Sequence, residues 1–398
     1  VVAVAGNGQA SITFTPPADN GSSTIISYTV TSSGGQFATG DGSTPIVVTG
    51  LTNGVAYTFT VTATNAAGTS AASAASSSVT PATVPDAPTG VSAVHGNGQA
   101  TVSFTPPVSN GGSVITSYTV TSNIGGHFAT GGASPITVTG LTNGVAYTFT
   151  VVATNAEGNS VASAASNSVT PATVPGAPTG VSAVAGNGQA TVSFTPPVSN
   201  GGSVITSYTV TSNIGGHFAT GGSSPITVTG LTNGVAYTFT VVATNAEGNS
   251  VASSASNSVT PATVPDAPTI GTATRGDGEV VITFTANGDG GSTITSYTVT
   301  SNLGHTATGG SSPITITGLT NGVTYTFTVT ATNAVGTSAA SAATNAVTFA
   351  SAPSAPTGVS AVAGIGQATV SFTPGASNGS AITSYTVTSN LGHTATGG

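Results

Sequence analysis

The residues that first suggest chemistry are Arg275, Gly276 and Asp277, the tripeptide that animal integrins recognise on some extracellular matrix proteins. Arg275 is also the only Lys or Arg residue in the sequence. The surrounding stretch ATRGDGEV aligns with AVHGNGQA and AVAGNGQA earlier in the chain, so its two glycines recur where the tripeptide does not. Asn and Asp are both favoured in tight turns. The stretch therefore predicts a turn, and integrin recognition at these three residues is the alternative.

A histidine recurs at the equivalent place in four similar segments, at His127, His217, His305 and His393. Gln36 takes its place in the first segment, and His95 has no counterpart in the other segments. A zinc site needs three or four ligands that converge. One histidine per segment cannot form such a site unless separate chains meet. We expect these histidines to face solvent or a neighbouring strand, and a pH-dependent or metal-linked contact between chains is the alternative.

The carboxylates are too few and too scattered for common acid–base chemistry. Asp277, Glu279 and Asp289 lie in one segment, but calcium takes six or more oxygen ligands and no DxDxDG pattern is present. Glu157 and Glu247 stand alone, and no carboxylate pair recurs as glycoside hydrolysis would require. No matching acid accompanies the histidines to complete a Ser-His-acid triad. The sequence predicts no catalytic residue, no metal site and no cofactor, with calcium at the three acids as the alternative.

Composition excludes further classes of protein. Only 3% of the 398 residues are charged, the net charge is −8, and Lys, Cys, Met and Trp are absent. Disulfides, thiolate sites and Schiff bases are therefore excluded, and nucleic acid is not an expected partner because its phosphates need Lys and Arg. The sequence contains no run of about 18 apolar residues, the length that a membrane-spanning helix needs. This composition suits an exported protein, and because Val1 is not an initiator Met we expect a mature chain or a piece of a longer protein.

The chain is built from repeats. The string SYTVTS recurs with tyrosines spaced 90, 90, 89 and 88 residues apart, at Tyr28, Tyr118, Tyr208, Tyr297 and Tyr385. We expect five repeats, of which the first lacks its opening residues and the last lacks its final strands, at 1–84, 85–174, 175–264, 265–352 and 353–398. The second and third repeats differ at only four positions, which suggests that copy number and length matter more than any one specialised repeat.

One repeat contains about seven short runs of alternating hydrophobicity, separated by turn residues. Val102 and Phe104 alternate with outward Thr and Ser, and Tyr147, Phe149 and Val151 share one face of the longest run. SAASNSVT, residues 163–170, is expected to form the final strand. No stretch shows helical periodicity. The pattern predicts an all-β chain of tandem seven-stranded antiparallel sandwiches.

Several segments match one known family in order. GLTNGVAYTFTVVATNAEGNS resembles the E–F turn, F strand and F–G loop of a fibronectin type III domain, and APTGVSAV, ATVSFTPP and ITSYTVTS resemble its A, B and C strands. The resemblance covers the whole chain, as four nearly complete copies and one partial copy. Members usually carry Trp on strand B, whereas this chain has smaller aromatics that still fill a core, at Phe14, Phe104, Phe194, Phe284 and Phe372.

The resemblance implies a structural role for the tyrosine after each E–F turn. In the tyrosine corner of such domains the hydroxyl bonds to backbone near the preceding turn. The matching residues are Tyr57, Tyr147, Tyr237 and Tyr325. An aromatic platform that binds sugar is the alternative for these side chains.

The outward positions of the strands are mostly Thr and Ser, and the edges lack the Lys residues that usually block edge-to-edge pairing. Proline-spaced linkers such as PATVPDAPT are expected to stiffen the connections between repeats. We predict a non-catalytic, bacterial, extracellular or cell-surface structural protein: a surface stalk, an adhesin shaft or a filament subunit. Its partners would be further copies, other surface proteins or polysaccharide. The alternatives are a spacer in a large secreted polysaccharide-degrading enzyme and an adhesin that binds a host receptor.

Overall fold

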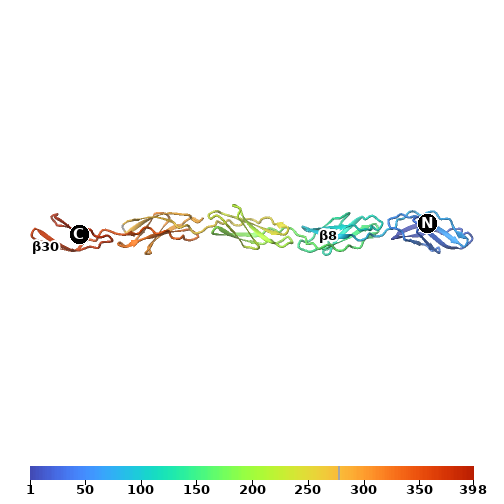
Figure 1. Ribbon diagram of the computed structural model, residues 1–398, viewed down its shortest axis with the longest axis horizontal. Coiled ribbons are helices and arrows are strands. Elements are labelled where there is room, and N and C mark those ends of the chain that lie inside the picture. The colour runs from blue at the N-terminus through green and yellow to red at the C-terminus, as the bar shows by residue number, and fades with distance from the viewer. Residues whose placement is uncertain (277) are drawn as a thin grey trace. The chain divides into compact units, whose positions relative to one another are not determined.

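The computed structural model describes residues 1–276 and 278–398, so Asp277 lies outside the described part. The chain divides into two compact units, one of residues 1–176, 197–206 and 243–250, the other of residues 177–196, 207–242 and 251–398. The described residues form strands and loops, drawn in chain order from blue to red in Figure 1. Across these two described ranges, no helix is long and apolar enough to cross a membrane.

The first two repeats have the same seven strands. In the first repeat they are β1 (Val2–Gly6), β2 (Gln9–Thr13), β3 (Ile25–Ser32), β4 (Phe37–Gly40), β5 (Ile46–Thr49), β6 (Phe59–Asn65) and β7 (Gly68–Thr69). In the second repeat they are β8 (Thr89–Gly96), β9 (Gln99–Thr105), β10 (Ser117–Ser122), β11 (Phe128–Gly131), β12 (Ile136–Thr139), β13 (Phe149–Asn155) and β14 (Gly158–Asn159).

The later repeats follow the same order. The third contains β15 (Thr179–Gly186), β16 (Gln189–Thr195), β17 (Ser207–Ser212), β18 (Phe218–Gly221), β19 (Ile226–Thr229), β20 (Phe239–Asn245) and β21 (Gly248–Asn249). The fourth contains β22 (Thr269–Arg275), β23 (Glu279–Thr285), β24 (Ser296–Ser301), β25 (Thr306–Gly309), β26 (Ile314–Thr317), β27 (Thr324–Tyr325), β28 (Phe327–Thr332) and β29 (Val347–Thr348). The fifth contains two hairpins, formed by β30 (Thr357–Gly364), β31 (Gln367–Thr373), β32 (Tyr385–Thr388) and β33 (Thr394–Gly397).

Each of the first two repeats folds as two antiparallel sheets. In the second repeat, one sheet has the order β12-β9-β8 and the other has the order β11-β10-β13-β14. The first repeat repeats this arrangement with β5-β2-β1 and β4-β3-β6-β7. Within the fourth repeat, β22-β23-β26 and β25-β24-β28 form the corresponding sheets. The predicted all-β architecture of tandem antiparallel sandwiches is confirmed.

The core forms where alternate side chains of the two sheets meet. Phe149, Val151 and Ala153 of β13 are fully buried, and they pack with Val102 of β9 and Val120 of β10 in one cluster. The alternation predicted for the longest strand is therefore confirmed. Burying side chains of this size stabilises a fold by about 1.5–3 kcal/mol each.

The aromatic residue of strand β9 takes the place expected for a larger Trp. Phe104 is buried, and its ring centroid lies 4.8 Å from that of Tyr118, with the ring planes tilted by 50°. Tilted aromatic pairs at this separation are favourable beyond the area they bury. The same pair recurs in the third repeat, where the rings of Phe194 and Tyr208 are also 4.8 Å apart.

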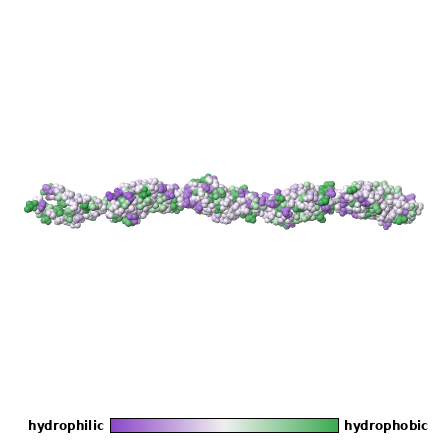
Figure 2. Space-filling view, viewed as in Figure 1, coloured by the Kyte–Doolittle hydropathy of each residue, from purple (hydrophilic) through white to green (hydrophobic). Residues whose placement is uncertain are grey.

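The outer surface is polar and nearly uncharged. Figure 2 shows residues of intermediate hydropathy over most of the visible face, with hydrophobic and hydrophilic residues scattered among them. Threonine hydroxyls bond across strands on this surface, as between Thr101 and Thr137 at 3.2 Å. Such neutral pairs replace the cross-strand ion pairs that other sheets use.

The expected final strand at residues 163–170 is wrong. In its place, every third residue is a buried serine whose N–H donates to the neighbouring strand β13 and whose hydroxyl oxygen accepts in return. Ser163 N–H donates to Val151 O at 3.0 Å, and Val151 N–H donates to Ser163 Oγ at 2.9 Å. Ser160 and Ser166 make the same exchange with Ala153 and Phe149.

In this serine ladder, every third residue of the segment pairs with every second residue of β13. Three residues of the segment advance as far as two residues of β13, about 6.7 Å, so the segment rises only about 2.2 Å per residue. A regular strand rises about 3.3 Å per residue and cannot match this spacing, so the N–H groups of β13 do not find backbone carbonyls at regular intervals. The serine hydroxyl supplies the missing acceptor, and it donates in turn to the next carbonyl, as Ser163 does to Ala164 O at 2.8 Å.

We predict that Ser163→Ala destabilises the second repeat by about 1–3 kcal/mol, because Val151 N–H is then buried without an acceptor. Hydrogen exchange at the Val151 amide, followed in the full chain, should become faster. Ser168→Ala is the matched control, since Ser168 is exposed two residues beyond the ladder. Equal protection of Val151 in both variants would contradict this account of the ladder.

Candidate functional site

Arg275 and Gly276 lie where strand β22 turns into β23. Arg275 pairs with Val280 across the hairpin, and Gly276 N–H donates to Glu279 O at 2.9 Å. The guanidinium of Arg275 donates from Nη1 to Thr348 O at 3.1 Å. The third residue of the tripeptide, Asp277, lies outside the described residues, so the turn stays the prediction for the tripeptide and integrin recognition stays its alternative.

The four predicted corner tyrosines are buried, each with 1–5% of its side chain exposed. In every case the hydroxyl oxygen accepts a hydrogen bond of 3.1 Å from the backbone N–H five residues earlier. The donors are Thr52 for Tyr57, Thr142 for Tyr147, Thr232 for Tyr237 and Thr320 for Tyr325. The bond ties the turn before the strand to the start of the strand.

The recurrent histidines lie against these tyrosines. The ring of His127 meets that of Tyr147 edge-on at 5.9 Å, and the ring of His305 meets that of Tyr325 at 5.6 Å. His305 Nδ1 also lies 3.4 Å from Ser301 Oγ. Over residues 1–276 and 278–398, no three His, Asp or Glu side chains group closely enough to hold a metal ion.

Some acidic side chains accept hydrogen bonds from their own turns. Asp289 Oδ1 accepts from Gly291 N–H at 2.9 Å. Asp41 Oδ1 accepts from the Ser43 hydroxyl at 2.6 Å and from its N–H at 3.1 Å, and these bonds lower the pKa of the Asp41 carboxyl below its usual 3.8. Short Asp side chains commonly cap turns in this way.

Sequence reasoning missed the residues that join one repeat to the next. Asn155, at the end of β13, donates from Nδ2 to Thr83 O in the preceding linker at 2.7 Å and to Asn110 O in a loop of its own repeat at 2.8 Å. Thr83 N–H donates to Gly111 O at 2.8 Å, and Asp86 N–H donates to Ser109 O at 3.0 Å. One amide group thus fastens the linker to two parts of the following repeat.

The same junction recurs. Asn245 donates to Thr173 O at 2.8 Å and to Asn200 O at 2.9 Å. Asn333 donates to Thr263 O and to Asp289 O, both at 2.8 Å. The signal available in the sequence was the Asn of the recurrent string ATNA, which stands at the same place in each repeat. Its partner lies about 70 residues earlier, and no sequence pattern indicates that the two are in contact.

Two backbones also meet at each junction. A Cβ added at Gly54 would lie 3.1 Å from Gly112 Cα, and one added at Gly112 would collide with Gly54 N. Gly112 has a φ of +83°, which further favours glycine. Only glycine therefore allows the turn of one repeat to touch the loop of the next.

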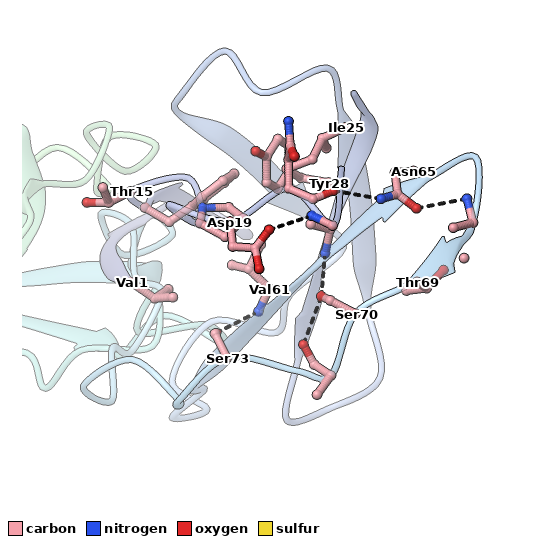
Figure 3. Close-up of a pocket in the computed structure, with 18 residues that line it drawn as sticks. Val1, Thr15, Asp19, Ile25, Tyr28, Val61, Asn65, Thr69, Ser70 and Ser73 are labelled. Atoms are coloured by element: carbon pink, nitrogen blue, oxygen red, sulfur yellow. Dashed lines mark hydrogen bonds between the residues drawn. The ribbon is translucent and has the colours of Figure 1, made fainter. Parts of the chain in front are cut away.

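A pocket of about 680 Å³ opens in the first repeat, beside strands β3 and β6 (Figure 3). Its walls include Phe14, Tyr28 and Ile25 on the apolar side and Asp19 and Asn65 on the polar side. Asn65 Nδ2 donates to Asn20 O at 2.8 Å. Asn65 is the counterpart of Asn155, Asn245 and Asn333 in the later repeats.

Comparison with known sequences finds the same domain family in four successive segments of the chain. The profile of the fibronectin type III domain matches residues 1–79, 86–169, 176–259 and 266–347, more than half of the chain. The chain resembles Exoglucanase B of Cellulomonas fimi, with 33% identity over 277 residues, which cover 64% of this chain and 24% of that protein. It also resembles Chitinase A1 of Niallia circulans, with 36% identity over 194 residues, 44% of this chain and 26% of that protein.

A further relative is a Kelch domain-containing protein of Saccharolobus solfataricus, 37% identical over 125 residues, which cover 30% of this chain and 17% of that protein. The chain thus spans about a quarter or less of the length of these relatives. Among solved structures, the crystal structure of the chicken CNTN1 FN1–FN3 domains is 16% identical, with a TM-score of 0.28, over 67% of this chain and 99% of that one.

We predict that Tyr147→Phe lowers the free energy of unfolding of the second repeat by about 0.5–1.5 kcal/mol, because the partly buried hydrogen bond from Thr142 N–H to the Tyr147 hydroxyl is lost. Thr142→Ala is the control: it keeps the backbone N–H and removes only an exposed side chain, so it should cost less than about 0.5 kcal/mol. Hydrogen exchange at the Thr142 and Tyr147 amides measures the loss of stability in both variants. A Phe variant as protected as the wild type would show that the hydroxyl contributes nothing.

Proposed function

The chain belongs to the fibronectin type III domain family, and from this premise we propose that it is a non-catalytic extracellular spacer. In this role the repeats set a distance between other parts of a larger protein at a cell surface or in a secreted molecule. Function on such a fold has to be argued from particular contacts, because these sandwiches serve many purposes.

The observation that carries the proposal is the repeated junction. Asn155, Asn245 and Asn333 each tie the preceding linker to the following repeat through two hydrogen bonds of 2.7–2.9 Å. Flexible linkers need no such contacts, and proline alone would stiffen the chain only locally. Identical fastening at successive junctions suits a protein whose length matters.

A spacer within a secreted polysaccharide-degrading enzyme is the more specific form of this proposal. Two relatives bear the names Exoglucanase B and Chitinase A1, and this chain covers only 24% and 26% of them. The shared segment would then be the part that separates domains rather than the part that cuts. A catalytic or sugar-binding domain encoded beside this chain in its gene supports this form, whereas only further repeats on both sides would favour a surface stalk.

A second candidate is a shaft or filament whose copies associate side by side. Phe37, Phe128 and Phe218 are each 67–68% exposed at the start of the edge strands β4, β11 and β18. An exposed aromatic residue on an edge without Lys is open to pairing with another strand. Concentration-dependent assembly that is lost on Phe128→Ser and Phe218→Ser together would support this candidate.

We predict that Asn155→Ala and Asn245→Ala loosen the junctions on their amino-terminal sides. Each variant leaves two backbone carbonyls without their shared donor, at a cost of about 1–3 kcal/mol. Hydrogen exchange at Thr83 and Thr173 should speed up, and small-angle X-ray scattering should show a wider spread of dimensions. Asn65→Ala is the matched control, because Asn65 bonds to Asn20 O within its own repeat. If all three variants scatter like the wild type, stiff junctions cannot be the basis of the function.

Arg275→Ala tests the adhesin alternative. We expect cells that display integrins to attach equally well, or equally poorly, to surfaces coated with the wild type and with the variant. The reason is that the guanidinium of Arg275 is bound to Thr348 O on its own domain. Attachment to the wild type that disappears in the variant would make receptor binding the function instead.

A further inference from the structure

Asparagine followed by glycine recurs in the turns and loops of every repeat, and this pair of residues is chemically reactive. The backbone nitrogen of the glycine can attack the asparagine side chain, because glycine has no Cβ to stand in the way. We infer that one such pair, Asn287–Gly288 in the fourth repeat, is a site of deamidation, and that the reaction releases the end of the linker that Asn287 holds. The inference does not depend on the role as a spacer, because it concerns one loop of one repeat.

The reaction needs only water. The backbone nitrogen of Gly288 forms a bond to Cγ of Asn287 and gives its proton to water. The bond from Cγ to Nδ2 breaks, Nδ2 takes up a proton, and ammonia leaves. Water then opens the cyclic imide at either of its carbonyls, so the asparagine becomes aspartate or isoaspartate. The glycine nitrogen must therefore be free to turn toward the side chain that precedes it.

In most Asn-Gly pairs of this chain the glycine N–H is already bound, to an acceptor 2.8–3.1 Å away. In the second repeat these bonds run from Gly98 to Asn143 Oδ1, from Gly111 to Ser109 Oγ and from Gly144 to Pro171 O. In the third repeat they run from Gly188 to Asn233 Oδ1, from Gly201 to Ser199 Oγ and from Gly234 to Pro261 O. Gly8, Gly21, Gly54 and Gly322 are bound through their N–H groups as well. Each bond holds the nitrogen away from the asparagine Cγ.

Across residues 1–276 and 278–398, the glycines of these pairs without a hydrogen-bond acceptor for their N–H are Gly288 and Gly379. They differ in how their backbones are enclosed. A Cβ added at Gly379 would collide with Phe349 O and lie 2.6 Å from Gly322 N, so other backbone confines this glycine. A Cβ added at Gly288 would meet only the exposed side chain of Asp266, 2.6 Å from Oδ2. Because that carboxylate can swing away, Gly288 has room to turn.

The loop that carries Asn287 differs from its counterparts in the second and third repeats. The second repeat has PPVSNGG at residues 106–112, whereas the fourth has the shorter ANGDGG at residues 286–291. Proline fixes the φ angle of its backbone, so a loop without the two prolines is less restricted. Asn287 and Gly288 are also both exposed, so water reaches the pair.

The side-chain amide of Asn287 holds the end of the linker. Its Nδ2 donates to Ala267 O at 2.6 Å and to Thr269 Oγ1 at 3.1 Å. Beside it, Asp266 N–H donates to Gly288 O at 2.8 Å. Deamidation replaces Nδ2 with a carboxylate oxygen, which repels the carbonyl oxygen of Ala267 instead of donating to it. Isoaspartate also adds one carbon atom to the main chain, which shifts Gly288 O relative to Asp266 N–H. The linker therefore loses its bonds to this loop.

The test incubates the full chain in warm, mildly alkaline buffer, once folded and once unfolded in urea. Mass spectrometry of peptic peptides locates each conversion, and labelling by an isoaspartyl methyltransferase counts the isoaspartate. In urea all Asn-Gly pairs should react at similar rates. In the folded chain Asn287 should react at roughly its rate in urea, whereas Asn97 and Asn143 should be slowed at least about fivefold, as one net hydrogen bond implies.

Two variants and one control complete the test. Gly288→Ala should slow the reaction at Asn287 at least about fivefold, because the new Cβ shields the nitrogen. Gly310→Ala is the matched control in the same repeat and should leave the rate unchanged, because nothing lies within 4 Å of a Cβ there. Asn287→Asp copies one product and should speed hydrogen exchange at the Asp266 amide.

Three results would overturn the site: equal rates at all Asn-Gly pairs of the folded chain, reaction at Asn378 ahead of Asn287, or an unchanged rate in Gly288→Ala. Unchanged exchange at the Asp266 amide in Asn287→Asp would overturn the release of the linker.

Discussion

The backbone of the buried strand β13, and of its counterparts in the other repeats, must have its hydrogen-bonding groups paired, and the rest of the structure depends on how this is done. An unpaired buried N–H or C=O costs about 1–3 kcal/mol. One edge of β13 pairs with β10. Along the other edge, the two-residue strand β14 pairs only with the end of β13, and Ser160, Ser163 and Ser166 supply acceptors from their side chains for the rest. Tyr147 fastens the start of this region, and Asn155 fastens its end to the preceding linker. The strand at the centre of the core is therefore also the strand whose terminal Asn holds the junction with the preceding repeat.

These fastenings use neutral groups almost throughout. The chain has one Arg, no Lys and nine Asp and Glu residues, so ion pairs contribute little to its stability. Serine hydroxyls, asparagine amides and tyrosine hydroxyls make the hydrogen bonds here, where charged side chains form ion pairs in other proteins. Hydrogen bonds between neutral groups are not screened as exposed charges are, so the junctions should hold equally well at low and high ionic strength. That property suits a protein exposed to a variable medium outside the cell.

The sequence was informative wherever a pattern is local or repeats. Alternation predicted the buried face of Phe149 and Val151, and the 88–90-residue spacing of the tyrosines indicated a tandem array. The segment at 163–170 was misread as a strand because it stands where a seventh strand is expected, and the three-residue spacing of Ser160, Ser163 and Ser166 shows its meaning only beside β13. Asn155 was missed because its contact with Thr83 spans 72 residues. In the sequence, glycines such as Gly112 look like ordinary turn residues. Only the structure shows that they lie close to the backbone of another repeat.

The most direct test of stiff, repeated junctions is the distribution of distances between two spin labels one repeat apart. The chain has no cysteine, so Val108→Cys and Val198→Cys, at two fully exposed equivalent positions, give one unambiguous pair. A second pair placed within one repeat gives the width contributed by the labels themselves. The account predicts that pulsed electron–electron double resonance gives one distance peak between the two labels. That peak should be about as narrow as the peak of the reference pair. A broad or multiple distribution across the junction would contradict it, because repeats joined in that way could not set a fixed distance.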